Sequence, residues 1–393
     1  MIETLKNIVG EQHLSATEAD LTAYSYDASG MEAEPALICW PTDAEQIRKI
    51  ILYCNRTNTP LMIRGLGTNT VGSTIGENAI ILDLTRMNRL YKEELKEKYL
   101  ELEPGIILKS LNSYLRRQGY ELPIAPYTGD FCTLGGMISQ NALGARSYTL
   151  GRMKDWILSL EYLDGTGKYY HLTKDFERIV GWEGTTGIII RAKILVTERI
   201  MRTSADLISF TGITALCQKL REVKKEPDVL AIDYLDRTCS AFLGIECSPH
   251  LLVEYYSDRG RIKEAEPLLR TLKRREAAHD MLRLKGYWHL EDPQIRAERL
   301  QEFLEWLERK EIPSFGPLGM NIIFSMFRQD EQDKRRNYYD QITTLNSVHA
   351  SVLGWGNRKK YLADLGTKHA LITLKEEYDY NNILNRGKII DFR

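Results

Sequence analysis

The stretch Arg64-Gly-Leu-Gly-Thr-Asn-Thr-Val-Gly-Ser73, which follows the apolar run Pro60-Leu-Met-Ile63, is the most informative part of this chain. A similar stretch, Cys132-Thr-Leu-Gly-Gly-Met-Ile-Ser-Gln-Asn-Ala-Leu-Gly144, comes further along. Glycines lack a Cβ, so the backbone N–H groups of such loops can converge on an anion, and the Thr, Ser and Asn side chains add donors. With a third loop, Glu183-Gly-Thr-Thr-Gly187, the pattern predicts a site that wraps a large phosphorylated cofactor.

Composition excludes several other classes of protein. The chain has 393 residues, of which 43% are hydrophobic and 27% charged, as in ordinary globular proteins. A net charge of −1 gives no basic field for nucleic acid. The six cysteines are scattered and form no C-x-x-C pair, so no zinc or iron–sulfur ligand set is visible. The N-terminus has no secretory pattern, and no apolar run of about 18 residues is present, so we expect a cytoplasmic protein without a membrane span.

The order of predicted elements indicates an α+β fold rather than a plain doubly wound sheet. The predicted strands are 36–40, 60–63, 79–84, 99–103, 157–163, 169–172, 187–196, 251–256 and 320–327. The predicted helices are 2–25, 44–55 with Asp43 as N-cap, 107–118, 212–224, 261–284, 294–309 and 370–378. Composition shifts after Glu198 towards charged helices, which predicts a second α+β domain.

An ordered set of motifs resembles one known family. The motifs are Pro41-Thr-Asp-Ala-Glu-Gln-Ile47, Arg64-Gly-x-Gly-Thr68, Glu103-Pro-Gly105, Cys132-Thr-Leu-Gly-Gly136, Tyr148-Thr-Leu-Gly151, Leu160-Glu-x-x-Asp-Gly165, Glu183-Gly-Thr-x-Gly187, Lys375-x-x-x-Asp379 and Asn385-x-Gly-Lys388. They resemble the vanillyl-alcohol oxidase/PCMH-type flavoproteins, most closely the glycolate oxidase and D-lactate dehydrogenase branch. The resemblance implies an α+β fold with a PCMH-type two-subdomain FAD-binding domain at 1–199, a reduced α+β cap at 200–355, and a C-terminal segment at 356–393 that returns to the FAD domain.

The resemblance also implies FAD as cofactor. Parts of the family attach the flavin through a histidine of the first loop, and this loop has none, so we expect noncovalent FAD. The expected cofactor-binding residues are Arg64, Gly65, Gly67, Thr68, Asn69, Gly72, Thr133, Gly135, Gly136, Asn141, Gly144, Glu183, Gly184, Gly187, Ile189, Asn385 and Lys388.

The chain departs from the family in the cap. Related 2-hydroxy-acid dehydrogenases carry two metal-binding segments there, His-x-Gly-Asp-Gly-Asn-x-His and Glu-His-Gly-x-Gly. The matching stretches are Phe315–Ile323, with Pro317 and Met320, and Ser351–Gly356, with Val352 and Leu353. These side chains cannot ligate a hard divalent ion, so we expect no metal site.

The resemblance implies FAD-dependent oxidation of a small hydroxylated substrate, such as a 2-hydroxy acid of the D-lactate or glycolate type. Hydride would pass to flavin N5 while a base removes the hydroxyl proton. The candidate catalytic residues are His289 and His349 as bases and Arg328 and Arg358 as carboxylate clamps. Asp292-Pro293 after His289 also fits the start of a helix, with Asp292 as its N-cap.

Two alternatives stay open because the metal ligands are missing. The chain could be an accessory or electron-transfer subunit of a heteromeric glycolate-oxidase-like complex, without its own substrate site. It could also be an active dehydrogenase with a different base and substrate. Since the chain shows no cysteine set for a cluster, the candidate electron acceptor is an iron–sulfur subunit or a second flavoprotein.

Overall fold

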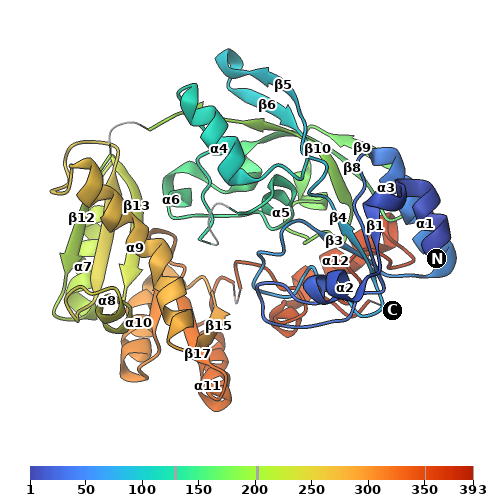
Figure 1. The fold of residues 1–393 in the computed structure, drawn as a ribbon. Coiled ribbons are helices and arrows are strands. Elements are labelled where there is room, and N and C mark those ends of the chain that lie inside the picture. Colours follow the sequence, from blue (N-terminus) through green and yellow to red (C-terminus); the bar gives the residue numbers. More distant parts are fainter. Residues whose placement is uncertain (128–130, 201–202, 350, 393) are drawn as a thin grey trace.

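The computed structural model describes residues 1–127, 131–200, 203–349 and 351–392. A part that holds β1 to β11 lies beside a second part that holds β12 to β17, here called the cap, and the C-terminal tail lies against the first part (Figure 1). The mixture of helices and sheets confirms the predicted α+β class.

The first subdomain is a four-stranded sheet in the order β1-β2-β4-β3, in which β2, β4 and β3 run parallel. Its strands are β1 (Leu14–Ser15), β2 (Leu37–Cys39), β3 (Leu61–Arg64) and β4 (Ile80–Asp83). Helices α1 (Ile2–Val9) and α3 (Ala44–Thr57) pack on one face, and α2 (Glu18–Tyr24) packs on the other. Asp43 caps α3 as predicted, since its carboxylate accepts the N–H of Gln46 at 2.8 Å.

The second subdomain is a five-stranded antiparallel sheet in the order β5-β6-β10-β8-β9. Its strands are β5 (Leu90–Glu94), β6 (Tyr99–Leu102), β8 (Ile157–Leu163), β9 (Tyr169–Leu172) and β10 (Ile188–Leu195), and a short pair joins β7 (Tyr120–Glu121) to β11 (Thr197–Glu198). Helices α4 (Leu108–Arg117) and α5 (Leu134–Ser139) bury their apolar side chains against it, and α6 (Ser147–Leu150) follows. The predicted hairpin is confirmed, because β8 and β9 pair directly.

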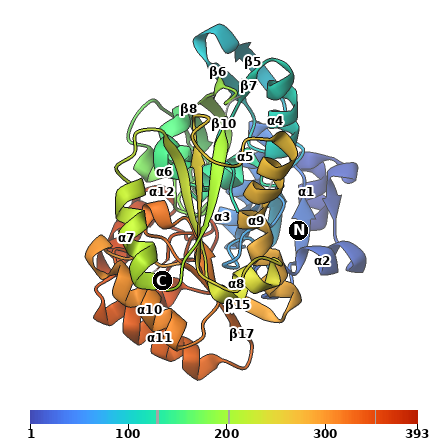
Figure 2. The same cartoon turned by 90° about the vertical axis from the view of Figure 1, so that its left-hand side faces the viewer.

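The cap is built on a six-stranded antiparallel sheet in the order β12-β14-β13-β16-β17-β15. Its strands are β12 (Ser204–Ser209), β13 (Val229–Leu235), β14 (His250–Tyr255), β15 (Tyr287–Glu291), β16 (Ser314–Gly316) and β17 (Phe324–Arg328). On one face lie α7 (Ile213–Val223), α10 (Leu300–Arg309) and α11 (Gln332–Thr344); on the other lie α8 (Arg237–Phe242) and α9 (Ala265–Leu284) (Figures 1 and 2). Every residue of β13 is therefore buried.

The tail returns to the first subdomain. After α12 (Leu365–Tyr378), the N–H of Leu61 donates to the Ile383 carbonyl at 2.8 Å, and the N–H of Asn385 donates to the Leu61 carbonyl at 2.9 Å. These bonds extend the parallel sheet at the β3 edge, where the glycine loop begins. The tail thus lies beside the site it was expected to complete.

Several predicted elements differ from the structure. The single helix expected over 2–25 is two helices, because Gly10 adopts φ 88° and ends α1. The helix expected from residue 294 begins only at Leu300, after a short 3₁₀ turn. Strands β12, β13, β15 and β16 and helix α11 were not predicted. Short 3₁₀ turns occur at Glu11–His13, Leu95–Glu97, Met153–Trp156, Phe176–Arg178, Ala297–Arg299, Leu318–Met320 and Lys360–Leu362. Among the described helices, none has the length and apolar character needed to cross a bilayer.

Candidate functional site

One cavity brings together the three glycine loops and the cap. Most of the expected cofactor-binding residues line it: Arg64, Gly65, Gly67, Thr68, Asn69, Thr133, Gly135, Gly136, Asn141, Glu183, Gly184, Gly187 and Ile189. Four others, Gly72, Gly144, Asn385 and Lys388, are not among the lining residues. From the 351–356 segment, Val352 and Leu353 also reach the cavity.

The first glycine loop is folded by its own asparagine. The side-chain oxygen of Asn69 accepts the N–H groups of Val71 at 3.2 Å and Ser73 at 2.9 Å, and its amide donates to Asp27 at 2.8 Å. Asn69 therefore shapes the loop. In contrast, the backbone N–H groups of residues 66–70 have no acceptor among the described residues. Donors of this kind, left free at a cavity, fit a phosphate group.

Arg64 supplies the cation of this loop. It is the last residue of β3, its side chain is almost fully buried, and its guanidinium carbon lies 5.0 Å from the centre of the Tyr24 ring. Its Nη1 has no hydrogen-bond partner among the described residues. Burial lowers the pKa of Arg64, yet an arginine stays protonated. A buried guanidinium nitrogen without an acceptor fits an anionic group such as the pyrophosphate of FAD.

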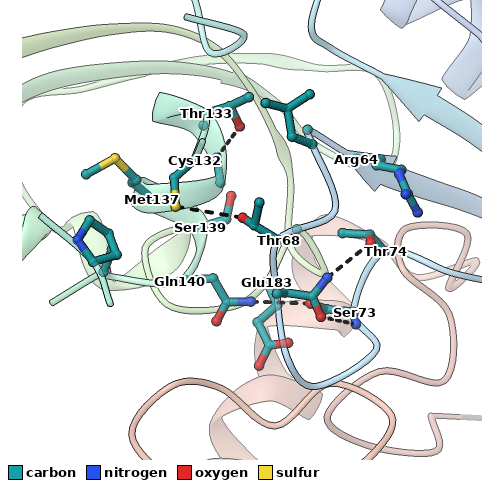
Figure 3. Close-up of a pocket in the computed structure, with 18 of the residues that line it drawn as sticks. Arg64, Thr68, Ser73, Thr74, Cys132, Thr133, Met137, Ser139, Gln140 and Glu183 are labelled. Carbon is teal, nitrogen blue, oxygen red and sulfur yellow. Dashed lines mark hydrogen bonds between the residues drawn. The ribbon is translucent and has the colours of Figure 1, made fainter. Parts of the chain in front are cut away.

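The second glycine loop approaches the first closely, and backbone N–H groups around α5 already have acceptors. Thr133 caps α5 by accepting the N–H of Gly136 at 3.3 Å, and the N–H of Gly135 donates to Pro104 at 2.8 Å (Figure 3). A Cβ at Gly65 would lie 2.3 Å from the Thr133 hydroxyl oxygen, so the two loops touch there. This loop therefore brings its backbone close to the first loop at the cavity.

The third glycine loop and the C-terminal tail hold neighbouring loops in place through side-chain hydrogen bonds. Glu183 is buried with φ 54°, and its carboxylate accepts the N–H groups of Trp355 at 2.6 Å and Gly356 at 3.0 Å. Burial raises the pKa of Glu183, and these backbone bonds oppose that rise. Asn385 accepts the N–H of Ile63 at 2.8 Å and donates to the carbonyl groups of Ser73 at 3.3 Å and Glu183 at 2.5 Å. Both side chains hold loops in place.

The remaining three predicted positions, Lys388, Gly144 and Gly72, do not line the cavity. Burial lowers the pKa of Lys388 to about 8, although the charges of Asp27 and Glu183 oppose the shift. A Cβ at Gly144 would lie 2.0 Å from the Ala125 carbonyl oxygen, so only glycine fits. Gly72 has φ 75°, which favours glycine.

The four candidate catalytic residues do not meet at the cavity. His289 lies on β15, and its Nδ1 has no partner among the described residues; His349 is exposed, and its carbonyl accepts the N–H of Gln294. Arg328 is exposed at the end of β17, with its guanidinium 4.7 Å from the Tyr287 ring centre. Arg358 lies nearer, behind the first glycine loop, where it donates to the Ser29 carbonyl at 3.1 Å. None of the four belongs to the lining.

The interpretation of Asp292 as a helix N-cap is wrong. The nearest helix starts at Leu300, and Asp292 instead accepts the N–H groups of Val352 at 2.6 Å and Leu353 at 2.5 Å. The chain pairs a carboxylate of the cap with a loop that follows it by many residues, and sequence spacing alone carries no signal for that contact.

Sequence reasoning also missed several lining residues. Gln140 donates to the Ser73 hydroxyl at 3.3 Å (Figure 3). Tyr127 donates to Asp233 of β13 at 2.5 Å. Cys132 contacts the Thr68 hydroxyl at 3.7 Å. Gln140 and Cys132 stand within the quoted glycine stretch, so their place could have been expected; nothing in the sequence singles out Tyr127. Among the described residues, no group of three or more His, Cys, Asp or Glu side chains is arranged to hold a metal ion.

Comparison with known proteins agrees with this geometry. The family described as "FAD binding domain" matches residues 35–173. This chain contains an FAD-binding domain. The match covers β2 to β9, which carry the first two glycine loops, and the free donors of the first loop fit the phosphates of FAD. The predictions of the family, of FAD as cofactor and of an FAD-dependent oxidoreductase are confirmed at this level.

Three relatives and one solved structure show how far the similarity extends. "Glycolate oxidase subunit GlcD" of Bacillus subtilis (strain 168) is 24% identical over 98% of this chain and 96% of its own length. A "D-2-hydroxyglutarate dehydrogenase" of Xanthomonas citri pv. viticola is 23% identical over 67% of this chain, and a "Probable D-lactate dehydrogenase, mitochondrial" of Danio rerio is 24% identical over 71%. Each of these two is matched over 60% of its own length. An alkyldihydroxyacetonephosphate synthase has the same fold, with a TM-score of 0.69 at 16% identity, over 98% of this chain and 84% of that one.

Proposed function

We propose that this chain is an FAD-dependent dehydrogenase or oxidase that takes hydride from the CH–OH group of a small substrate, with 2-hydroxy acids of the D-lactate or glycolate type as the first candidates. The observation that carries the proposal is that one cavity is lined both by the FAD-binding loops and by the cap residues Val352 and Leu353. Flavin, when bound, supplies the hydride acceptor. The names of the relatives, which include glycolate oxidase and D-lactate dehydrogenase, support the same class.

Different residues would bind the cofactor, position the loops and cover the substrate. The N–H groups of residues 66–70 and the Arg64 guanidinium would hold the phosphates. Glu183 and Asn385 keep the loops at their mutual distances. Val352 and Leu353 would cover the substrate and exclude water. We expect the flavin to be noncovalent, since the first loop has no histidine.

The test is an anaerobic visible spectrum of the purified protein before and after addition of D-lactate, glycolate or D-2-hydroxyglutarate. We expect a flavin spectrum that bleaches with at least one hydroxy acid, and flavin that is released to the supernatant by acid precipitation. A flavin that stays oxidised with a wide panel of hydroxy acids and sugar alcohols would refute the proposed oxidation. Flavin in the acid pellet would refute noncovalent binding.

One observation favours a second candidate function. No histidine of the described chain lines the cavity, and neither metal segment keeps its ligands. An accessory or electron-transfer subunit of a heteromeric complex needs no substrate base, and one relative is itself named a subunit. Affinity purification from the source cells distinguishes the two. A stable iron–sulfur or flavoprotein partner, together with an unreactive isolated chain, would favour the subunit.

A further inference from the structure

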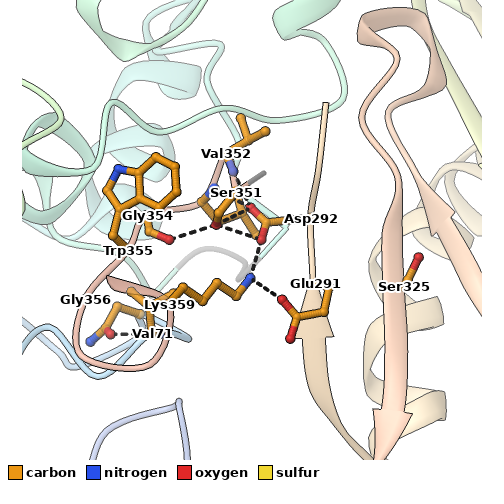
Figure 4. Close-up of polar contacts among 12 residues, drawn as sticks. Val71, Glu291, Asp292, Ser325, Ser351, Val352, Gly354, Trp355, Gly356 and Lys359 are labelled. Atoms are coloured by element: carbon orange, nitrogen blue, oxygen red, sulfur yellow. Dashed lines mark hydrogen bonds and ion pairs between the residues drawn. The ribbon is translucent and has the colours of Figure 1, made fainter. Parts of the chain in front are cut away.

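The segment Ser351–Gly356, here called the bridging loop, is held by two buried carboxylates, one from each part of the molecule. Asp292 follows β15 of the cap, and its carboxylate accepts the N–H groups of Val352 and Leu353 at the start of the loop (Figure 4). Glu183 belongs to the FAD domain, and its carboxylate accepts the N–H groups of Trp355 and Gly356 at the end of the loop. The loop is therefore fixed at both ends relative to the cavity.

Both carboxylate oxygens of Asp292 have partners. Besides the two backbone N–H groups, its carboxylate accepts the Ser351 hydroxyl at 2.9 Å and pairs with the Lys359 ammonium group. Asp292 and Lys359 are both essentially inaccessible to water, and Lys359 also lies 3.5 Å from Glu291 (Figure 4). Arg335 lies 3.8 Å from Glu291 and balances the second carboxylate, so this cluster leaves no free cation for a ligand.

What the bridging loop presents to the cavity is consequently apolar. Val352 and Leu353 line the cavity and pack against the cluster that includes Leu143 and Phe324. Among lysine and arginine side chains of the described chain, only Arg64 lines the cavity, and it stacks on Tyr24 beside the phosphate loop. A ligand carboxylate against Val352 and Leu353 would lose its hydration without gaining a cation, whereas an alkyl group there would gain from burial.

We propose that Val352 and Leu353 form a specificity wall, held by Asp292, that selects hydroxylated substrates with an apolar end. This inference rests on the proposed function, and it names the substrate class of the same site. The part of the substrate that lies against this wall is an alkyl group, where the family's metal-binding segment would have offered charged ligands.

The test compares two hydroxy acids that share a head group and differ at the far end: D-2-hydroxyisocaproate and D-2-hydroxyglutarate. The holoprotein is mixed anaerobically with each, and flavin bleaching gives the ratio of second-order rate constants. We expect the alkyl acid to be favoured by at least about 100-fold. A ratio below about 3-fold, or one that favours the dicarboxylate, would overturn the wall while leaving the proposed oxidation intact.

Two substitutions localise the effect. Leu353→Ala should reduce the preference for the alkyl acid by about 10-fold, since one lost hydrophobic contact is worth that much discrimination. Leu353→Arg, which supplies a cation, should shift the ratio towards D-2-hydroxyglutarate. Val348→Ala is the control, because Val348 lies just before the loop, is 45% exposed and does not line the cavity. Equal ratios in all three variants and the parent would overturn the proposal.

A binding measurement keeps the wall testable if no hydroxy acid bleaches the flavin. The unreactive acids 4-methylvalerate and glutarate are titrated into oxidised holoprotein, and perturbation of the flavin absorbance reports occupancy. We expect 4-methylvalerate to perturb the spectrum of the parent, with weaker binding to Leu353→Ala. Tighter binding of glutarate, or no binding of 4-methylvalerate, would count against the wall, whereas failure of bleaching alone would count only against the oxidation.

Discussion

Replacing Asp292 by alanine should be among the most destabilising single changes in the cap. It removes the acceptor of two backbone N–H groups at 2.5 and 2.6 Å and the partner of the buried Lys359. Burial lowers the pKa of Lys359, but the charges of Asp292 and Glu291 outweigh burial and raise it. Breaking one side of a buried pair typically costs about 3–5 kcal/mol. Because Glu291 remains 3.5 Å from Lys359, we expect the lower part of that range, about 3 kcal/mol.

The assay is urea unfolding followed by tryptophan fluorescence, with the parent, Asp292→Ala, Lys359→Met and the double variant in a thermodynamic cycle. The double variant should recover at least about 1 kcal/mol relative to the sum of the single changes, because it removes the stranded charge. A free energy of unfolding within about 0.5 kcal/mol of the parent for Asp292→Ala would refute the reasoning. Additive single changes would likewise show that Asp292 and Lys359 do not form the pair described.

Other predictions concern the cofactor loops. Gly136→Val should lower FAD occupancy while the protein stays folded, because a Cβ there meets only the Thr133 hydroxyl at 3.1 Å; full flavin content would show that this backbone does not approach the cofactor. Gly144→Ala should destabilise the fold by about 3 kcal/mol in thermal or urea unfolding, since its Cβ would lie 2.0 Å from a carbonyl oxygen, and parental stability would contradict this. In flavin-free protein, Lys388→Met should be stabilising below pH 8. The lysine is charged in the unfolded chain up to about pH 10.5 but loses its proton at about pH 8 when folded. The stability of the parent therefore rises between these two pH values, and the difference in stability between Lys388→Met and the parent shrinks. A stability difference between variant and parent that stays constant from pH 7 to 10 would contradict the lowered pKa.

Much of the FAD domain could be predicted because its signals are local. A glycine loop directly after an apolar strand specifies both the turn and the close backbone approach, and Arg64 to Asn69 line the cavity. The Asp43 cap of α3 is a contact over three residues and is equally readable. Local rules succeed wherever the partners are neighbours in sequence.

The cap was harder to predict from the sequence, because several of the residues that contact one another there lie far apart in the chain. β13 is buried along its whole length between two helical layers, so it lacks the alternation that marks a half-exposed strand. One of its two neighbours in the sheet, β16, comes from a distant segment of the chain. The roles of Asp292 and Glu183 were unreadable for the same reason, since each carboxylate binds backbone N–H groups more than 50 residues away.

The bridging loop links the loss of the metal-binding segments to the way this site is built. A loop whose side chains ligate a cation is fixed by that cation; here Val352 and Leu353 have no such ligand atoms, and the loop is fixed instead through its backbone by Asp292 and Glu183. Restoring a ligand at Val352 alone would therefore not restore a metal site. The other segment offers Pro317 and Met320 in place of ligands, and the nearby Asp292 is already neutralised by Lys359. The loop therefore presents an apolar surface to the cavity and offers no side chain that could take the hydroxyl proton of a substrate.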